Sequence, residues 1–437
     1  MNRMEEWMAL QEELEQIPME TEGTVERAAG RFRRRRMVWQ PLTAAAMVAV
    51  CFVAAVNLSP TVAQACSQVP VLAQLARAVS FSSSLRQAVE REYVQIVDQT
   101  AEDRGVTAHI QSLIVDQRQV HLYFTLESEE YDKLSALPEV FLEDGTDAQA
   151  VITGSYGGQN NGELLHAAVD FLPEAQVPET IQVVLRVYDE AAEARTLVAK
   201  PTFTLQIDPE YRAQGRKAAL EVPFCFGEER FWVTGVEIYP THIRLQVEGA
   251  PENRTYLKWM EFSLVLPDGT EIYDSSAAGI GGTSDPVTGE RKTFYAESSF
   301  FMETDQLELK IHEAGLLDKD APRTQVNLET GACDSAPLNG ECTVETPGEI
   351  WCTFDGLPER RFVLFEPTLY DSAGKAYPTG GYGMGWNQDG RAQQYLCIPE
   401  EFPDTEVYLQ PEITRLYVPE QPVTVKLDMT EGKERES

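Results

Sequence analysis

The most distinctive segment of the chain is a run of 21 residues without a charge. Residues 37–57 read MVWQPLTAAAMVAVCFVAAVN, and most of their side chains are apolar. A helix of about 20 residues rises about 30 Å, which matches the hydrocarbon core of a bilayer. Trp39 suits the headgroup interface, and Pro41 falls in the first turns, where its missing N–H does little harm. The pattern predicts one transmembrane helix over residues 37–57.

Five arginines lie directly before this stretch, namely Arg31, Arg33, Arg34, Arg35 and Arg36. Cationic residues beside a single span keep their side of the chain in the cytoplasm. We therefore expect a cytoplasmic segment over residues 1–36 and extracellular domains from about residue 58 onward, in a single-pass protein of the cell membrane. Two alternatives stay open: the stretch is a buried core helix, or it belongs to a signal peptide that is cleaved after Ala63-Gln64-Ala65.

The cytoplasmic segment begins with apolar and acidic residues at a helical period. At about 100° per residue, one narrow arc of residues 3–17 holds Trp7, Leu10, Leu14 and Ile17, and glutamates occupy the other half. An isolated helix of this length is marginal in water, so its apolar face needs a partner. The pattern indicates a docking helix for a cytoplasmic regulator; the alternative is a solvated tail without stable structure.

Beyond the span, residues 58–100 are predicted to form a helical stalk of two short helices. The first lies in VPVLAQLARAV from Val69 onward, and the second follows Ser84-x-x-Gln87, which resembles a capping box. From Gly105 the period changes to two, which is typical of strands. Residues 105–128 read as two strands joined by a polar turn.

The same order of signals occurs three times after residue 100. Strand pairs are expected at 105–128, 231–250 and 349–367; tight turns at 142–146, 267–270 and 371–375; glycine-rich loops at 155–162, 278–284 and 380–386; and alternating strands at 179–187, 304–311 and 404–413. Repeated order of this kind predicts repeated domains. The expected fold class is mainly β, with tandem immunoglobulin-like β-sandwiches over residues 101–212, 218–318 and 330–430.

The net charge of −34 narrows the choice of partners. Seventy acidic residues stand against 36 basic ones, and nearly all of the excess lies after residue 57. Because nucleic-acid binding needs surfaces rich in lysine and arginine, we expect no nucleic-acid partner. An acidic surface mainly supplies solubility, with cation binding in the cell wall as an alternative.

The sequence contains no recognisable motif for catalysis, metal binding or cofactor binding. The five histidines, His109, His121, His166, His242 and His312, show no metal-ligand spacing and read as structural or exposed. The segment GGYGMGW at 380–386 lacks the lysine and the following helix of a phosphate loop, and it reads as a hairpin tip, with sugar stacking on Tyr382 and Trp386 as the alternative. The sequence therefore predicts neither an enzyme, nor a metal site, nor a cofactor.

Four of the seven cysteines lie in the last predicted domain: Cys333, Cys342, Cys352 and Cys397. Outside the cell they could form up to two disulfides. Four cysteines allow three connectivities, and spacing does not choose among them. No Cys-x-x-Cys pair occurs, which argues against a redox pair of that type.

The region from about residue 40 to 130 resembles a known family. Its landmarks are Ser59-Pro60, Val69-Pro70, Tyr93-Val94-Gln95 and Leu126-Glu127-Ser128. The region is similar to the extracytoplasmic domain of single-span membrane proteins from Gram-positive bacteria, many of them described as anti-sigma factors. An immunoglobulin-like domain often follows in such proteins, and residues 218–315 look like one. The resemblance implies a regulatory role and no catalytic residue. The sequence lacks the His-x-x-x-Cys-x-x-Cys pattern of zinc-containing anti-sigma domains.

These observations favour a membrane-anchored regulator of the anti-sigma-factor type. Its β domains would sense an envelope condition, while the helix around Trp7, Leu10, Leu14 and Ile17 would hold a cytoplasmic regulator such as a sigma factor. The alternative is an envelope adhesion or scaffold protein whose β domains bind cell-wall polymer or another protein.

Overall fold

The computed structural model describes residue 79 and residues 82–430, with gaps at 92, 149, 154–160, 172–175, 192–195, 213–214, 274–282, 285–289, 303, 335, 346–347 and 358–361. The predicted docking helix, the arginine cluster and the predicted span at 37–57 lie outside the described residues. Within the described part of the chain, no helix is both long and apolar enough to cross a membrane. The described chain is mainly β, as predicted, with one α-helix, α6 (Ser83–Glu90).

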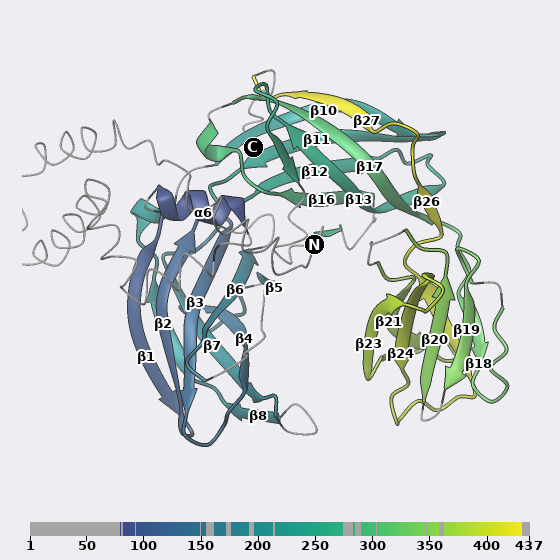
Figure 1. Cartoon of the computed structure of the whole chain (residues 1–437), viewed down its shortest axis with the longest axis horizontal. Helices are drawn as coiled ribbons and strands as arrows, with labels where there is room; N and C mark the ends of the chain where they lie inside the picture. The colour runs from purple at the N-terminus through teal and green to yellow at the C-terminus, as the bar shows by residue number, and fades with distance from the viewer. Residues whose placement is uncertain are drawn as a thin grey trace, which may run out of the picture. The chain divides into compact units, whose positions relative to one another are not determined.

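The first β-sandwich consists of two antiparallel sheets (Figure 1). One sheet has the order β1-β2-β3-β6-β5, and in the other β7 pairs with β4, β8 and β9. The strands are β1 (Gln95–Asp103), β2 (Val106–Val115), β3 (Gln119–Ser128), β4 (Leu134–Leu142), β5 (Ala150–Thr153), β6 (Leu164–Phe171), β7 (Thr180–Asp189), β8 (Thr196–Ala199) and β9 (Thr202–Gln206). Alternate residues of both sheets, such as Leu122 and Val183, meet in one apolar core.

The second sandwich repeats this topology. Its first sheet has the order β10-β11-β12-β16-β15, and its second is built on the pair β13–β17. The strands are β10 (Arg216–Phe226), β11 (Glu229–Ile238), β12 (Ile243–Gly249), β13 (Thr255–Val265), β14 (Glu271–Tyr273), β15 (Thr283–Ser284), β16 (Arg291–Ala296) and β17 (Gln306–Asp318), with the 3₁₀ turns η1 (Pro209–Tyr211) before β10 and η3 (Phe300–Met302) before β17. The expected strand pair at 231–250 is β11–β12.

A third sandwich is inserted into the second one. Its sheets have the orders β18-β25-β21-β22 and β19-β20-β24-β23. The strands are β18 (Thr324–Asn327), β19 (Glu341–Glu345), β20 (Glu349–Phe354), β21 (Phe365–Tyr370), β22 (Ala376–Pro378), β23 (Gly381–Trp386), β24 (Ala392–Cys397) and β25 (Glu406–Pro411). The chain then returns to β17 as β26 (Arg415–Tyr417) and β27 (Val423–Asp428), which lie beside it in Figure 1.

This return differs from the predicted third domain over residues 330–430. Val425 and Leu427 of β27 are buried in the core of the second sandwich, not of the third. Their alternation correctly indicates a strand, but periodicity does not tell which sheet a strand joins. The expected pair at 349–367 is also wrong, because β20 pairs with β24 whereas β21 pairs with β22 and β25 in the other sheet.

The three predicted tight turns share one hydrogen-bond pattern. In each turn the backbone N–H of the first residue donates a hydrogen bond to the backbone carbonyl four residues later. The pairs are Leu142 with Thr146, Leu266 with Thr270, and Asp371 with Lys375. The glycine of each turn has a positive φ, between 81° and 88°, which L-residues with a side chain adopt rarely. At Gly269 and Gly374 the turn joins two paired strands, while the turn at Gly145 connects strands of different sheets.

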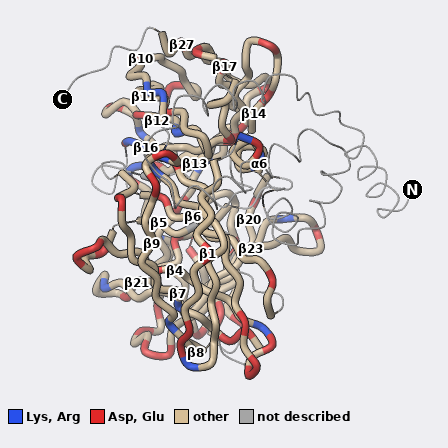
Figure 2. Tube along the Cα trace, turned by 90° about the vertical axis from the view of Figure 1, so that its left-hand side faces the viewer, with Lys and Arg blue, Asp and Glu red and all other residues tan. Residues whose placement is uncertain are grey.

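Two local differences concern the predicted stalk. Helix α6 begins two residues earlier than the capping box suggests, because the N-cap is Ser82, whose side chain accepts the hydrogen bond from the Leu85 N–H. The expected second helix would run to Ile96, but β1 already begins at Gln95 and pairs with β2. Acidic residues of the described chain lie mostly in turns and at strand ends (Figure 2), where water solvates them.

Candidate functional site

The first sheet of the first sandwich is buried on both faces along β3 and β6. Val120 and Leu122 point into the apolar core, while Gln119 and His121 on the opposite face are also 0% and 2% exposed. A sheet face that would otherwise meet water is therefore covered. Because buried polar groups need hydrogen-bond partners, this covered polar face is a candidate functional site.

Two histidines meet on this face. Nδ1 of His121 on β3 lies 3.0 Å from Nε2 of His166 on β6, and the rings stack with centroids 5.2 Å apart. The Tyr123 ring also stacks on that of His166, with centroids 4.9 Å apart. Burial lowers the pKa of His166 to about 4. Burial, followed by the charge of His166, also holds the pKa of His121 well below its usual value, so both rings are neutral at pH 7.

Asp116, in the turn between β2 and β3, joins the first sandwich to the second. One carboxylate oxygen accepts the N–H groups of Arg118 and Gln119, at 2.8 and 2.9 Å. The other oxygen accepts the hydroxyl of Thr241 at 2.5 Å and lies 3.4 Å from Nδ1 of His242, both in the turn between β11 and β12. Burial opposes the charge on Asp116, but His242 and these hydrogen bonds outweigh it and hold its pKa below the usual value.

An ion pair connects the same two sandwiches a short way along the sheet. Arg244 on β12 donates to the carboxylate of Asp170 on β6 and, at 3.1 Å, to the carbonyl of Phe171. Tyr295 on β16 donates its hydroxyl to the second oxygen of Asp170 at 2.6 Å. Burial disfavours the charge on Arg244, but Asp170 more than compensates and raises the pKa of the guanidinium. Both carboxylate oxygens of Asp170 therefore accept hydrogen bonds from side chains of the second sandwich.

A third set of contacts is made by Tyr239 at the end of β11. Its hydroxyl accepts a hydrogen bond from Nε of Arg118 at 3.1 Å and donates one to Glu237 at 3.0 Å. Arg118 also lies 3.8 Å from Glu237. Burial raises the pKa of Tyr239 further above its usual value, so the hydroxyl keeps its proton and can donate. We use the name junction for the contacts described so far. It comprises the triad of Tyr239, Arg118 and Glu237 and the contacts of Asp116, His121, His166, Asp170, Thr241, His242, Arg244 and Tyr295.

The carboxylate of Glu297 holds the N-terminus of helix α6 against the second sandwich. Oε2 of Glu297, just after β16, accepts the hydroxyls of Ser82 at 2.9 Å and Ser83 at 3.1 Å, and the backbone N–H of Ser84 at 2.6 Å. The Ser84 hydroxyl donates to the same oxygen and accepts the backbone N–H of Ser298. A carboxylate at a helix N-terminus is favoured by the unpaired N–H groups and by the helix dipole. We call this arrangement the Glu297 clamp.

The clamp and the junction are connected. The Ser298 hydroxyl donates to the backbone carbonyl of Tyr239, whose side chain contacts Arg118 of the first sandwich. Helix α6, the second sandwich and the turn after β2 are thus joined by successive hydrogen bonds. The described residues hold no group of three or more His, Cys, Asp or Glu arranged for a metal ion. What the junction can do chemically is hold two sandwiches together through buried charges and neutral imidazoles.

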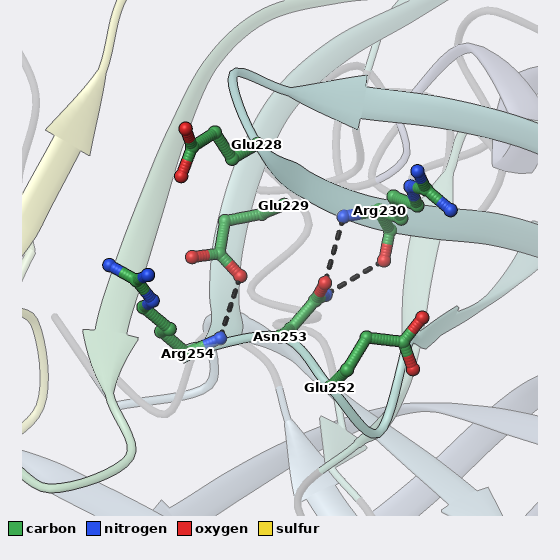
Figure 3. Close-up of a pocket in the computed structure, with 6 residues that line it drawn as sticks. All are labelled: Glu228, Glu229, Arg230, Glu252, Asn253 and Arg254. Atoms are coloured by element: carbon green, nitrogen blue, oxygen red, sulfur yellow. Dashed lines mark hydrogen bonds between the residues drawn. The ribbon is translucent and has the colours of Figure 1, made fainter.

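A separate pocket of about 330 Å³ lies at one end of the second sandwich (Figure 3). It is lined by Glu228 of the β10–β11 turn, by Glu229 and Arg230 at the start of β11, and by Glu252, Asn253 and Arg254 before β13. The Asn253 side chain exchanges two hydrogen bonds with the backbone of Arg230, and Glu229 accepts the N–H of Arg254. These contacts tie two loops together, and the lining is polar, unlike most ligand pockets.

Sequence reasoning missed the junction. The residues Trp7, Leu10, Leu14 and Ile17, predicted to bind a partner, and the arginines predicted to set topology lie outside the described residues. The sequence predicts that His121, His166 and His242 are structural or exposed. All three are buried, and the fold brings the first two together and places the third next to Asp116. One usable signal was present in residues 164–171, where Leu164 and Ala168 add apolar residues to the face opposite Leu165, Ala167, Val169 and Phe171, as is typical of a strand buried on both faces.

Fold and junction together define a tandem β-sandwich protein whose first two sandwiches are joined by buried polar contacts. Residues 33–128 match the model of a domain of unknown function, DUF4179. A 67-residue segment is 39% identical to the anti-sigma-V factor RsiV of Bacillus subtilis (strain 168), over 15% of this chain and 24% of that protein. The match spans about a quarter of the length of that relative.

Among solved structures, the crystal structure of a conserved domain protein from Bacillus anthracis aligns with a TM-score of 0.40. The alignment is 12% identical and covers 56% of this chain and 85% of that one.

Proposed function

We propose that this chain is a membrane-anchored regulator of the anti-sigma-factor type, which acts by binding and not by catalysis. Residues 1–36 lie in the cytoplasm, held there by Arg31 and Arg33–Arg36, and residues 37–57 cross the membrane. The helix with Trp7, Leu10, Leu14 and Ile17 on one face docks a sigma factor or a related regulator. The three sandwiches lie outside the cell and respond to a condition of the envelope.

The similarity to DUF4179 supports this proposal because the matched residues include both the predicted span and the start of the first sandwich. The match over residues 33–128 begins within the arginine cluster, includes the uncharged stretch, and ends with β3. It therefore contains both the predicted span and α6, and it also contains Asp116 and His121, which belong to the junction. A segment of this extent fits a module that connects a membrane helix to a sensing domain.

The observation that carries the proposal is the Glu297 clamp. Helix α6 is the first described helix after the predicted span, and its N-terminus is held by the second sandwich, more than 200 residues away in sequence. A displacement of the second sandwich therefore reaches the segment that leads to the membrane. Coupling between sites requires two states with different affinity for the partner. We propose that the closed state has an intact clamp and junction, and that the signal favours an open state.

The test uses the full-length chain in its native host. The sigma factors that co-purify with the detergent-solubilised wild type are compared with those of Leu10→Asp/Leu14→Asp and of Glu297→Ala. We expect the first variant to lose the sigma factor and the second to change its amount, with Glu129→Gln, an exposed acidic residue, as the matched control. Absence of any sigma factor or other regulator from the wild-type preparation contradicts the proposal.

A second candidate function, adhesion or scaffolding, is supported by one surface. Strand β23 is an edge strand of the third sandwich, and its alternate residues Tyr382, Met384 and Trp386 are 49%, 36% and 37% exposed. The segment is thus a strand and not the expected hairpin tip. Aromatic side chains in a row on an edge strand suit a sugar polymer or an added peptide strand. Binding of purified wall polymer that Tyr382→Ala weakens, and that deletion of residues 1–30 leaves unchanged, favours this candidate.

A further inference from the structure

Three cysteines of the third sandwich lie together. Cys342 on β19 and Cys352 on β20 are directly opposite each other in the antiparallel pair, and their Sγ atoms lie 2.7 Å apart. Both side chains belong to the apolar core, with residue exposures of 7% and 0%. Directly opposite residues in such a pair have Cα atoms about 4.5 or 5.5 Å apart, which is within the range that a disulfide spans.

The third cysteine, Cys333, also interacts with Cys342. Cys333 follows β18, where it pairs with Val326, and it packs against the edge of the same core while remaining partly exposed. Its thiol is hydrogen-bonded with that of Cys342 and also donates to the carbonyl of Asp334 at 2.9 Å. Cys342 therefore lies between a partly exposed thiol and a fully buried one.

The remaining described cysteines are placed differently. Cys397 ends β24 opposite Glu349, whereas Gln394 of the same strand is opposite Cys352. Because side chains alternate between the faces of a strand, Cys397 points to the face opposite that of Gln394 and Cys352. Cys225 is an exposed residue of β10 in the second sandwich. All five described cysteines are unpaired in the structure, so the two disulfides considered from the sequence are not formed in it.

We propose that Cys333, Cys342 and Cys352 form a thiol–disulfide exchange site that takes up one disulfide from a low-molecular-weight disulfide oxidant. The Cys333 thiolate attacks the oxidant, forms a mixed disulfide and releases one thiol. The Cys342 thiolate then attacks the Cys333 sulfur and releases the second thiol. The Cys352 thiolate finally attacks the Cys342 sulfur, which leaves a Cys342–Cys352 disulfide and a free Cys333. Two protein thiols are oxidised and one oxidant disulfide is reduced to two thiols.

The order of these steps follows from burial. Cys352 is inaccessible to an oxidant in the folded protein, so its oxidation needs an accessible thiol as the point of entry, and Cys333 is the neighbour of Cys342 that meets solvent. The product lies in the core, where a thiol reductant cannot attack it directly and must act through Cys333. Only thiolates attack disulfides, and the hydrogen bond with Cys342 together with burial raises the pKa of Cys333. Oxidation should therefore be slow at pH 7 and faster at higher pH.

The test treats the full-length protein, folded and in detergent, with oxidised glutathione, and maps its disulfides by mass spectrometry after alkylation. We expect a Cys342–Cys352 disulfide with Cys333 alkylated. Cys333→Ser should slow its formation at least tenfold. Cys352→Ser should accumulate the Cys333–Cys342 disulfide, and Cys342→Ser should stop at the Cys333–glutathione mixed disulfide. Cys397→Ser and Cys225→Ser are the matched controls and should behave like the wild type.

Three results overturn the proposal. One is a disulfide that includes Cys397. Another is wild-type oxidation kinetics in Cys333→Ser, which would mean that the buried pair is oxidised without an entry thiol. The third is that the folded wild type forms no disulfide under conditions in which the urea-unfolded chain does. Circular dichroism of each variant shows that the fold is kept, so none of these results can be attributed to a misfolded protein.

Discussion

Asp170 of the first sandwich and Arg244 of the second form an ion pair whose side chains are only 5% and 3% exposed. The partners lie 74 positions apart in sequence, on β6 and β12, and Tyr295 completes the hydrogen bonding of the carboxylate. Charges this deeply buried are tolerated only when they are paired. The way in which the first two sandwiches pack against each other thus depends on the ion pair of Asp170 with Arg244.

Removal of one member of this pair should be costly. Arg244→Met leaves the Asp170 carboxylate buried with one tyrosine hydroxyl, and we expect the free energy of unfolding to fall by about 3–5 kcal/mol. The matched control is the exposed pair of Arg291 with Glu248, with side chains 69% and 37% exposed, where Arg291→Met should cost less than about 1 kcal/mol. Urea unfolding measures both. Equal losses in the two variants would show that the buried pair is not a main contact of the junction.

The free energy of unfolding should decrease as the pH falls, because of the buried pair of His121 and His166. The pKa of His166 is about 4 in the folded protein, against about 6.5 in the unfolded chain. The unfolded state therefore binds the proton first, and stability present above pH 6.5 is lost as the pH falls toward 4, by on the order of 3 kcal/mol for this group. His121 adds a loss of the same sign, since its pKa is also lowered.

The pH dependence can be assigned with two variants. His166→Gln should flatten the change in unfolding free energy between pH 6.5 and 5, a range in which most carboxylates have not yet titrated. His109→Gln is the control, because His109 is on β2 with a partly exposed side chain next to Asp98. If the wild type and His166→Gln lose stability in parallel over this range, the neutral imidazole pair does not control the acid response.

The Glu297 clamp predicts a local effect on α6. Glu297→Gln keeps the size of the side chain but removes the charge that the N-terminus of α6 and three serine hydroxyls share. We expect the amides of residues 84–90 to exchange hydrogen at least tenfold faster, with little change in the cores of the sandwiches. Hydrogen exchange with mass spectrometry measures this, and Glu129→Gln should leave α6 unaffected. Unchanged protection of α6 in Glu297→Gln would refute the clamp.

The return of the chain to the second sandwich also has a measurable consequence. Leu427 on β27 is 1% exposed in the core formed with β10, β13 and β17. Leu427→Ala should cost about 2–5 kcal/mol, and hydrogen exchange should increase in residues 216–318. If protection is lost instead in residues 341–397, then β27 belongs to the third sandwich.

Much of the fold could be predicted from local pattern, and the junction could not. The alternation at 179–187 and 304–311 predicts strands that the structure contains as parts of β7 and β17, and Asp268-Gly269 predicts the β13–β14 hairpin. These features depend on neighbouring residues only. The contacts of Asp116 with Thr241, and of Glu297 with Ser84, join positions more than 100 residues apart.

The errors have the same origin. The pairing of β27 with β17, and the separation of β20 from β21 into different sheets, are choices between sheets that residue periodicity does not encode. The N-cap of α6 is Ser82 and not the predicted Ser84, because the Ser84 side chain is used in tertiary hydrogen bonds with Glu297 and Ser298. Long-range partners decided each of these cases, and local propensity did not.

The most direct test of the regulatory proposal is photo-crosslinking from the N-terminal helix in living cells. A photoreactive residue at Leu10 or Leu14, on the apolar face, should crosslink a sigma factor. The same residue at Glu6 or Glu13, on the acidic face, should not, and Glu297→Ala should change the yield at Leu14. If Leu10 and Leu14 give no crosslink to a sigma factor or another transcription regulator, while the chain is present in the membrane, the proposal is wrong.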